Sequence, residues 1–251
     1  TSINLADDEE LMRLMVEAGF NAVFVGIETP NEESLAECAK SQNRNRDLQA
    51  AVKKLHNFGL EVQGGFIVGF DSDPLSIFKT QINFIQKTGI VTAMVGLLNA
   101  PPGTRLYQRL KKENRILSGF DGSNTDCNFI PRMKYQTLID GYKNILKNIY
   151  SSKQYYERMH TFLKDFKPPK VKAGEFKFIY ITALWRSFWI LGIREKGKRY
   201  YWKLMLNTFF RRPRSLPVAV KLAIYGYHFR LVAQKYVEKA FGVQKTETSA
   251  G

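Results

Sequence analysis

Cysteine and histidine are scarce in this chain of 251 residues, which has two cysteines and three histidines. Cys38 and Cys127 stand alone, with no second cysteine at ligand spacing. Their isolation excludes a disulfide scaffold, a cysteine-rich zinc site and an iron–sulfur cluster held by this chain's cysteines alone. We expect both to be inert small apolar residues, with Cys127 facing a substrate as the alternative. So few cysteines favour a reducing, cytoplasmic compartment.

Long uninterrupted apolar runs are also missing. The opening TSINLADDEE is polar and acidic, so we expect no signal peptide there, and without an initiator Met we expect the chain to start inside a longer protein. The most apolar stretch, residues 176–193, is interrupted by Lys177 and Arg186. It is too short and too charged for a membrane span, which predicts a buried or interfacial helix.

Acidic residues become rare in the second half of the chain. The overall composition, with 44% apolar residues, is that of a globular protein. Residues 1–131 hold 13 Lys and Arg against 16 Asp and Glu, whereas residues 132–251 hold 25 against 7. Aromatic residues divide similarly, 10 and 23. This asymmetry predicts two modules with different roles. We expect them at 1–116 and 132–243, joined by a linker or substrate loop at 117–131 and followed by a disordered tail at 244–251.

The first module alternates helical and strand patterns. The strands that we expect are 22–27, 62–68 and 90–98. The helices that we expect are 7–19, one from Asn31, 47–58, 73–88 and 104–114, with Asp73 capping its helix. This order predicts a parallel sheet, as part of a (β/α) barrel or as an open doubly wound sheet. In either case ligands bind at the carboxyl ends of the strands.

Side chains alternate along a strand, so each of the first two strands has one bulky and one sparse face. We expect the bulky faces to pack against helices; they carry Val23, Val25, Ile27, Val62, Phe66 and Val68. The sparse faces carry Phe24, Gly26, Glu28, Gln63, Gly65, Ile67 and Gly69. Missing side chains at glycines leave room for a ligand, and Glu28 brings a carboxylate to the rim. The alternative is tight packing at the glycines, with Glu28 paired to a nearby Arg.

Three motifs in order carry a family resemblance: GIETP at 26–30, GFIVGF at 65–70 and PPGTRLY at 101–107. Together they resemble the second half of a radical SAM barrel. More narrowly, they are similar to the radical SAM proteins with an N-terminal cobalamin-binding domain, in the branch that includes hopanoid methylases. The similarity continues from YKNI at 142–145 to YGYHF at 225–229. The fold implied is α/β: the C-terminal half of a radical SAM (β/α) barrel, followed by an α-helical domain.

The resemblance also implies site residues for S-adenosylmethionine (SAM). Glu28 maps onto the polar residue near the ribose, because a carboxylate accepts hydrogen bonds from two vicinal hydroxyls. The glycine–isoleucine–glycine pattern beside the adenine maps onto Gly65, Ile67 and Gly69. Backbone contacts to the adenine edge map around Leu98 and Asn99. The opening residues 1–4, Ser2 among them, map onto the end of a preceding strand near the methionine moiety of SAM.

The family's C-x-x-x-C-x-x-C loop and the cobalamin-binding domain are absent from the chain. We therefore interpret the chain as a fragment or truncated product. Its partners would be the missing N-terminal part of the barrel and the cobalamin domain, which would hold a 4Fe-4S cluster and cobalamin. The parent would be a radical SAM methyltransferase acting on an unactivated carbon, with a lipid as one implied substrate class. The chain alone would be inactive and would supply part of the SAM pocket.

The second module shows helical patterns at 135–150, 151–166, 199–210 and 217–241. Its cations interleave with Trp and Tyr, which leaves three interpretations open: an anionic membrane surface or lipid-like substrate, a nucleic acid, or a solvated face over an aromatic core. The lack of a nucleic-acid motif disfavours the second. His56 is expected at the surface and His228 in a packed or capping role. The competing function is a non-enzymatic membrane- or partner-binding module on an α/β scaffold.

Overall fold

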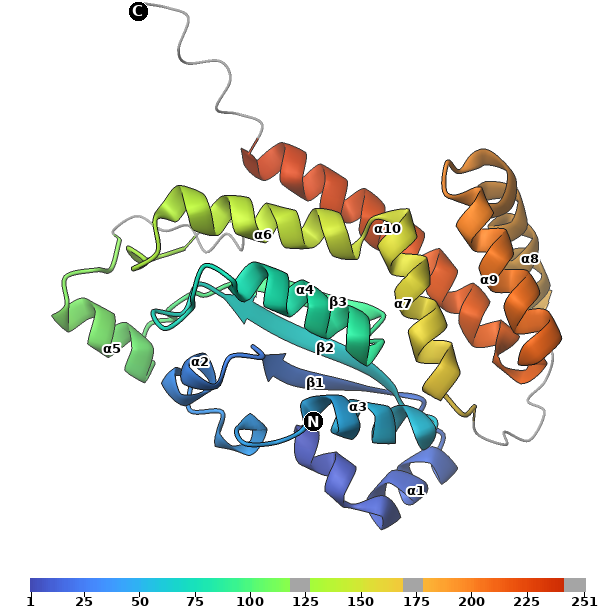
Figure 1. Ribbon diagram of the computed structural model, residues 1–251, viewed down its shortest axis with the longest axis horizontal. Coiled ribbons are helices and arrows are strands. Elements are labelled where there is room, and N and C mark those ends of the chain that lie inside the picture. Colours follow the sequence, from blue (N-terminus) through green and yellow to red (C-terminus); the bar gives the residue numbers. More distant parts are fainter. Residues whose placement is uncertain (118–126, 169–177, 242–251) are drawn as a thin grey trace, which may run out of the picture.

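The computed structural model describes residues 1–117, 127–168 and 178–241. Within these ranges, a three-stranded parallel sheet has the order β1–β2–β3 (Figure 1). The strands are β1 (Ala22–Glu28), β2 (Glu61–Val68) and β3 (Thr92–Leu97). Their parallel pairing confirms the predicted α/β arrangement. Most of the expected 117–131 loop and the whole expected tail at 244–251 lie outside the described residues.

Helices connect the strands and flank them in the acidic half. They are η1 (Ile3–Asp7), α1 (Glu9–Glu17), α2 (Glu32–Glu37), η2 (Ser41–Asn43), α3 (Leu48–Asn57), α4 (Ile77–Thr88) and α5 (Arg105–Lys112). The side chains of Asn31, Asp47 and Thr104 cap α2, α3 and α5 by accepting a backbone N–H three residues ahead. The helix expected at 7–19 is α1, which starts at Glu9 because Asp8 accepts the Leu11 N–H as its cap.

The prediction that Asp73 caps the third connecting helix is wrong, since α4 begins at Ile77. The Asp73 carboxylate instead accepts the N–H groups of Gly69 and Phe70, at 2.8 and 3.1 Å. Its second oxygen accepts the Ser34 hydroxyl at 2.7 Å. Burial raises the pKa of Asp73. The residue therefore closes the turn after β2 and ties it to α2.

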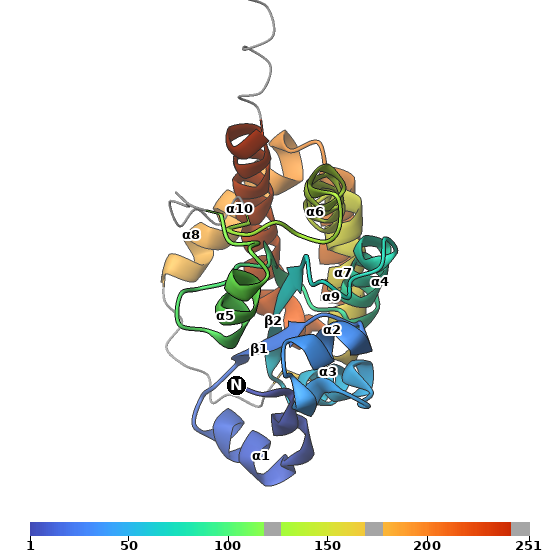
Figure 2. The same cartoon turned by 90° about the vertical axis from the view of Figure 1, so that its left-hand side faces the viewer.

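The two faces of the sheet differ as predicted. Val23, Val25 and Ile27 are buried, as are the bulky residues of β2, and Figure 2 shows α3 and α4 on one side of the sheet. The opposite face is open. On this face, the side chain of Phe24 in β1 is 48% exposed and that of Met94 in β3 is 47% exposed.

Side chains from two helices close the outer edge of β3. These helices are α6 (Tyr135–Ile149) and α7 (Ser152–Asp165). Alternate carbonyls of a strand point to the same edge. Here the carbonyl of Val91 accepts from Arg158 at 3.1 Å, that of Ala93 from the Tyr150 hydroxyl at 2.7 Å, and that of Val95 from the Tyr142 hydroxyl at 3.2 Å. No further strand can pair at these positions without displacing them, which leaves β1 as the other sheet edge.

The basic half continues with α8 (Phe178–Ser187), the π-helix η3 (Phe188–Arg194), α9 (Lys198–Arg211), η4 (Pro213–Ser215) and α10 (Leu216–Phe241). None of the helices in the described ranges is long and apolar enough to cross a bilayer. The helices pack onto the α/β module: Lys221 of α10 pairs with the buried Glu61 at 2.7 Å, and the Tyr155 hydroxyl donates to the Leu222 carbonyl at 2.8 Å. One hydrophobic core spans both halves of the chain.

The prediction that His56 lies at the surface is wrong. Its side chain on α3 is fully buried, because α7 covers this helix and the Phe162 ring meets the imidazole edge-on at 4.8 Å. Burial lowers the pKa of His56 to about 3. By contrast, His228 on α10 is exposed and meets the edge of the Phe229 ring at 5.9 Å.

Candidate functional site

An ion pair lies at the carboxyl end of β1. The Glu28 backbone has a φ of 64°, which places this residue in the left-handed region and interrupts the pairing with β2. Its carboxylate contacts the Lys40 ammonium at 2.9 Å. A side chain at Gly26 would meet the Glu28 carboxylate at 2.6 Å and the Lys40 nitrogen at 3.0 Å, so the pair lies over Gly26 on the open face. Lys40 takes the place of the Arg that we considered as a partner.

Residues with little or no side chain form the floor beside this pair. In the register of the sheet, Gly26 is opposite Gly65, and Ile67 is opposite Gly96. The Phe24 ring lies over Gly65, where an added Cβ would be 2.9 Å from it. Nothing lies within 4 Å of a Cβ built on Gly96. The structure therefore brings Glu28 and Ile67 to the same face, with free space at Gly96 that the motif comparison missed.

Space is restricted at the other predicted positions near the strand ends. Gly69 is buried, and a side chain there would meet Leu138 of α6 at 3.2 Å. The Leu98 N–H already donates to the Val68 carbonyl at 2.8 Å. The Asn99 amide oxygen accepts the Asn128 N–H at 3.2 Å. The predicted adenine contact at Leu98 therefore depends on its carbonyl group, and the roles of all three residues stay predictions.

The opening residues lie along β1 but do not form the expected strand end. The Thr1 ammonium donates to the Phe24 carbonyl at 2.7 Å, while the Ser2 hydroxyl accepts the Asn4 N–H at 3.3 Å and caps η1. The expectation of a strand over residues 1–4 is thus wrong, because Ile3 is buried and starts a 3₁₀ helix.

A network of partly buried charges fixes the loops at the strand tips. The Asp71 carboxylate, after β2, accepts hydrogen bonds from both terminal guanidinium nitrogens of Arg115, at 2.6 and 2.8 Å. It also lies 3.2 Å from the Arg109 guanidinium. Arg109 also contacts Glu37 of α2 at 2.7 Å. Burial works to raise the pKa of Asp71, but the hydrogen bonds and charges of the arginines outweigh it and lower that pKa. These charges compensate one another, so the network holds α2, α5 and the β2 turn together. No local spacing in the sequence indicates it.

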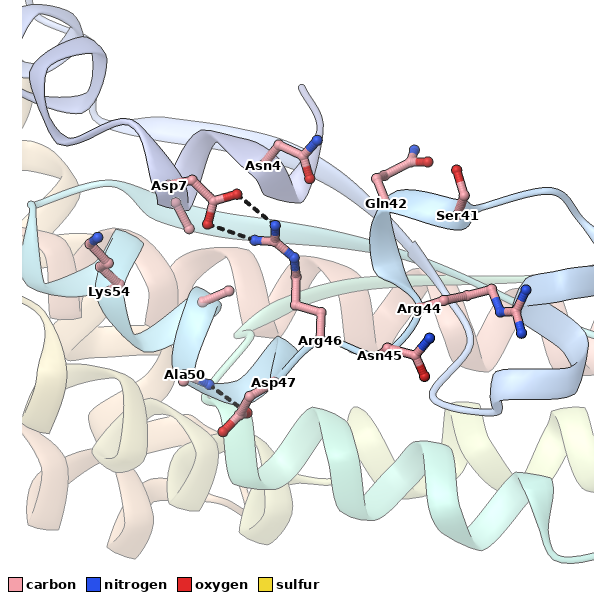
Figure 3. Close-up of a pocket in the computed structure, with 12 residues that line it drawn as sticks. Asn4, Asp7, Ser41, Gln42, Arg44, Asn45, Arg46, Asp47, Ala50 and Lys54 are labelled. Atoms are coloured by element: carbon pink, nitrogen blue, oxygen red, sulfur yellow. Dashed lines mark hydrogen bonds and ion pairs between the residues drawn. The ribbon is translucent and has the colours of Figure 1, made fainter.

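A polar cavity of about 610 Å³ lies between η1, η2 and the start of α3 (Figure 3). Its most prominent charges are already paired: Arg46 donates to both oxygens of Asp7, at 2.9 and 2.6 Å, and Lys54 contacts Glu9 at 2.8 Å. Of the predicted positions, Asn4 from the opening residues lines it, whereas Glu28, Ser2 and the residues expected near the adenine do not. The open face of the sheet is therefore the better candidate site.

The open face fits part of a nucleoside, since it offers a carboxylate at the rim, a clear floor at Gly96 and an aliphatic side chain at Ile67. It offers no such fit to a metal cluster: among the described residues, no group of three or more His, Cys, Asp or Glu side chains converges. Burial raises the pKa of the Cys38 thiol, and Cys127 is buried.

Residues 104–240 match the family model described as a domain of unknown function, DUF4070, which is found in B12-binding radical SAM methylases. The chain is 33% identical over 249 residues to an uncharacterized methyltransferase of Synechocystis, covering 97% of this chain and 46% of the relative. It is 28% identical over 218 residues to the hopanoid C-2 methylase of Rhodopseudomonas palustris, covering 84% and 41%.

A third relative is the bacteriochlorophyllide d C-12(1)-methyltransferase of Chlorobaculum tepidum, at 27% identity over 159 residues, covering 63% of this chain and 35% of the relative. The chain thus spans less than half the length of these curated relatives. From the match over more than half of its length, the chain belongs to the DUF4070 family, whose domain occurs in B12-binding radical SAM methylases.

Proposed function

We propose that this chain is the C-terminal portion of a radical SAM methylase that transfers a methyl group to an unactivated carbon, and that its open sheet face forms one wall of the SAM pocket. The observation that carries the proposal is the Glu28–Lys40 pair over Gly26, next to the clear floor at Gly96. Relatives named as methyltransferases support it, the hopanoid C-2 methylase among them. The name of that methylase makes a lipid our proposed substrate class.

In this proposal, the Glu28 carboxylate accepts hydrogen bonds from the two vicinal hydroxyls of the SAM ribose. Lys40 orients this carboxylate through their 2.9 Å contact. Gly96 lets the adenine approach the backbone, and Ile67 packs against its face. The Phe24 ring must turn away from Gly65 for the base to contact that residue, which its 48% exposure allows. In the complete protein, a 4Fe-4S cluster would supply an electron for SAM cleavage and cobalamin would supply the methyl group; we assign neither to residues of this chain.

The rest of the barrel is the proposed partner, and β1 is where we place it. The outer edge of β3 is occupied by Tyr142, Tyr150 and Arg158, so an added strand must pair with β1. Asn43 already donates to the carbonyls of Gly26 and Ile27, both at 3.0 Å. The Thr1 ammonium donates to the Phe24 carbonyl, so pairing would involve β1 before Phe24, and a strand that reaches Phe24 would replace the Thr1 contact.

Isothermal titration of SAM into the complete protein tests the proposal. Glu28→Gln keeps the size of the side chain but removes its charge, and it should weaken SAM binding about 10- to 100-fold, the usual value of hydrogen bonds to a charged group. Lys40→Gln is the matched control for the ion pair, because it breaks the same pair without removing the ribose acceptors. We expect it to weaken binding less. Equal effects of the two variants, or unchanged affinity in Glu28→Gln, would contradict the role of Glu28.

A further inference from the structure

An apolar face rich in tryptophan is exposed on α8 and η3. It consists of Leu184, Trp185, Trp189 and Ile193, and we call it the tryptophan face. Trp185 is 68% exposed and Trp189 is 48% exposed. The positions 185, 189 and 193 recur every four residues, so they share one side of the helix and its π-helical continuation. Contiguous exposed apolar patches often mark interaction sites.

The opposite side of the same segment is held firmly against α9. The Ser187 and Tyr201 hydroxyls are 3.0 Å apart in a buried hydrogen bond, and the Trp202 indole N–H donates to the Gly192 carbonyl at 2.9 Å. Phe188 stacks on Trp185, with ring centroids 5.7 Å apart. The packed side fixes the helix, so the tryptophan face is presented outward as a preformed surface.

Positive charge predominates in the part of the sequence that carries this face. Residues 182–235 contain twelve Lys and Arg and one acidic residue, Glu195, which contacts Arg230 at 3.3 Å. Exposed cations follow the face at the turn between η3 and α9; they are Arg194, Lys196, Lys198 and Arg199. The Arg194 guanidinium lies 5.9 Å from the Trp189 ring centroid. A cation and an indole ring of the face therefore lie close together, in a segment that holds a single acidic residue.

We propose that the tryptophan face docks on the interfacial region of an anionic lipid bilayer. Indole rings favour the depth of the headgroups, where their apolar body is buried and their N–H stays solvated. Lys and Arg side chains near an anionic bilayer add electrostatic attraction. Leu184 and Ile193 favour lipid over nucleic acid, because aliphatic side chains bury in acyl chains but do not stack on bases. This inference rests on the basic module and does not depend on the proposed SAM pocket.

The tryptophans themselves report on docking, because the chain has three, Trp185, Trp189 and Trp202, all in α8–α9. Vesicles of equimolar phosphatidylcholine and phosphatidylglycerol, titrated into the chain, should shift the Trp emission to the blue. Brominated lipids should quench it. Vesicles of phosphatidylcholine alone should bind more weakly, and added salt should weaken binding to the anionic vesicles because it screens the cations.

Variants distinguish docking through the tryptophan face from nonspecific adsorption to vesicles. The double variant Trp185→Ser/Trp189→Ser should weaken sedimentation with anionic vesicles by about tenfold or more. Phe20→Ser, which removes a 55% exposed aromatic residue from the acidic module, is the matched control and should leave it unchanged. If the double variant misfolds by circular dichroism, Lys196→Glu/Lys198→Glu tests the same surface through its charge. Equal binding to neutral vesicles, unchanged binding of the variants, or tighter binding of the chain to polyuridylate RNA than to vesicles would overturn the proposal.

Discussion

Acidification should destabilise this protein through His56. The imidazole is fully buried, and neither ring nitrogen has a hydrogen-bond partner among the described residues. Burial lowers its pKa from 6.5 to about 3. Below pH 6.5 the unfolded chain therefore takes up a proton at this residue that the folded chain does not, and stability falls as the pH falls. The loss is about 1.4 kcal/mol per pH unit, or about 2 kcal/mol between pH 6.5 and about pH 5.

Urea unfolding, followed by far-ultraviolet circular dichroism from about pH 7.5 to about pH 5, measures this effect. The matched variant is His56→Met, which retains an adaptable apolar side chain and forfeits no hydrogen bond. The stability difference between parent and variant cancels the other titrating groups. We expect that difference to shift by about 2 kcal/mol in favour of the variant at the acidic end. A difference that stays constant with pH would refute the reasoning, because His56 would then be hydrated or normally titrating.

Two further predictions concern the packing between the modules. Gly89 has a φ of 70°, and a Cβ there would lie 2.9 Å from the Phe162 backbone nitrogen, so Gly89→Ala should cost about 3 kcal/mol in unfolding free energy. Gly103→Ala, with a φ of 86° and nothing within 4 Å, is the control and should cost about 1 kcal/mol; equal losses would show that α7 yields to the added methyl group. Tyr150→Phe leaves the Ala93 carbonyl without its donor and should lower stability by about 2 kcal/mol. No change in the urea midpoint would mean that water replaces the hydroxyl.

Features set by neighbouring residues were predictable from the sequence. The alternation of Val23, Val25 and Ile27 indicates the buried face of β1 because side-chain direction has a period of two. The cap at Asn31 follows from a short polar side chain placed just before a helical pattern, although the same signal failed at Asp73. The order of the three motifs along the chain also predicted a family that the matches to known proteins support.

Features that depend on distant segments were not predictable. His56 is buried by Phe162, which is far away in the sequence. The hydroxyl of Tyr150 closes a strand edge that no local pattern connects with it. In the candidate site, alternation placed Glu28 and Ile67 on one face, but the contact with Lys40 depends on the path of the chain after α2. The position of the Phe24 ring is a matter of rotamer, which the sequence does not specify.

The SAM affinity of the complete protein carrying Gly96→Val tests the central claim most directly. A Val side chain suits a strand, and nothing lies within 4 Å of the position where its Cβ would be. The melting temperature should therefore not fall, whereas the added methyl groups would occupy the space that we assign to the nucleoside. We predict SAM binding at least about tenfold weaker than in the parent, equivalent to about 1.4 kcal/mol. Undiminished SAM binding in a folded Gly96→Val protein would contradict the account, because this face could not then be the wall of the pocket.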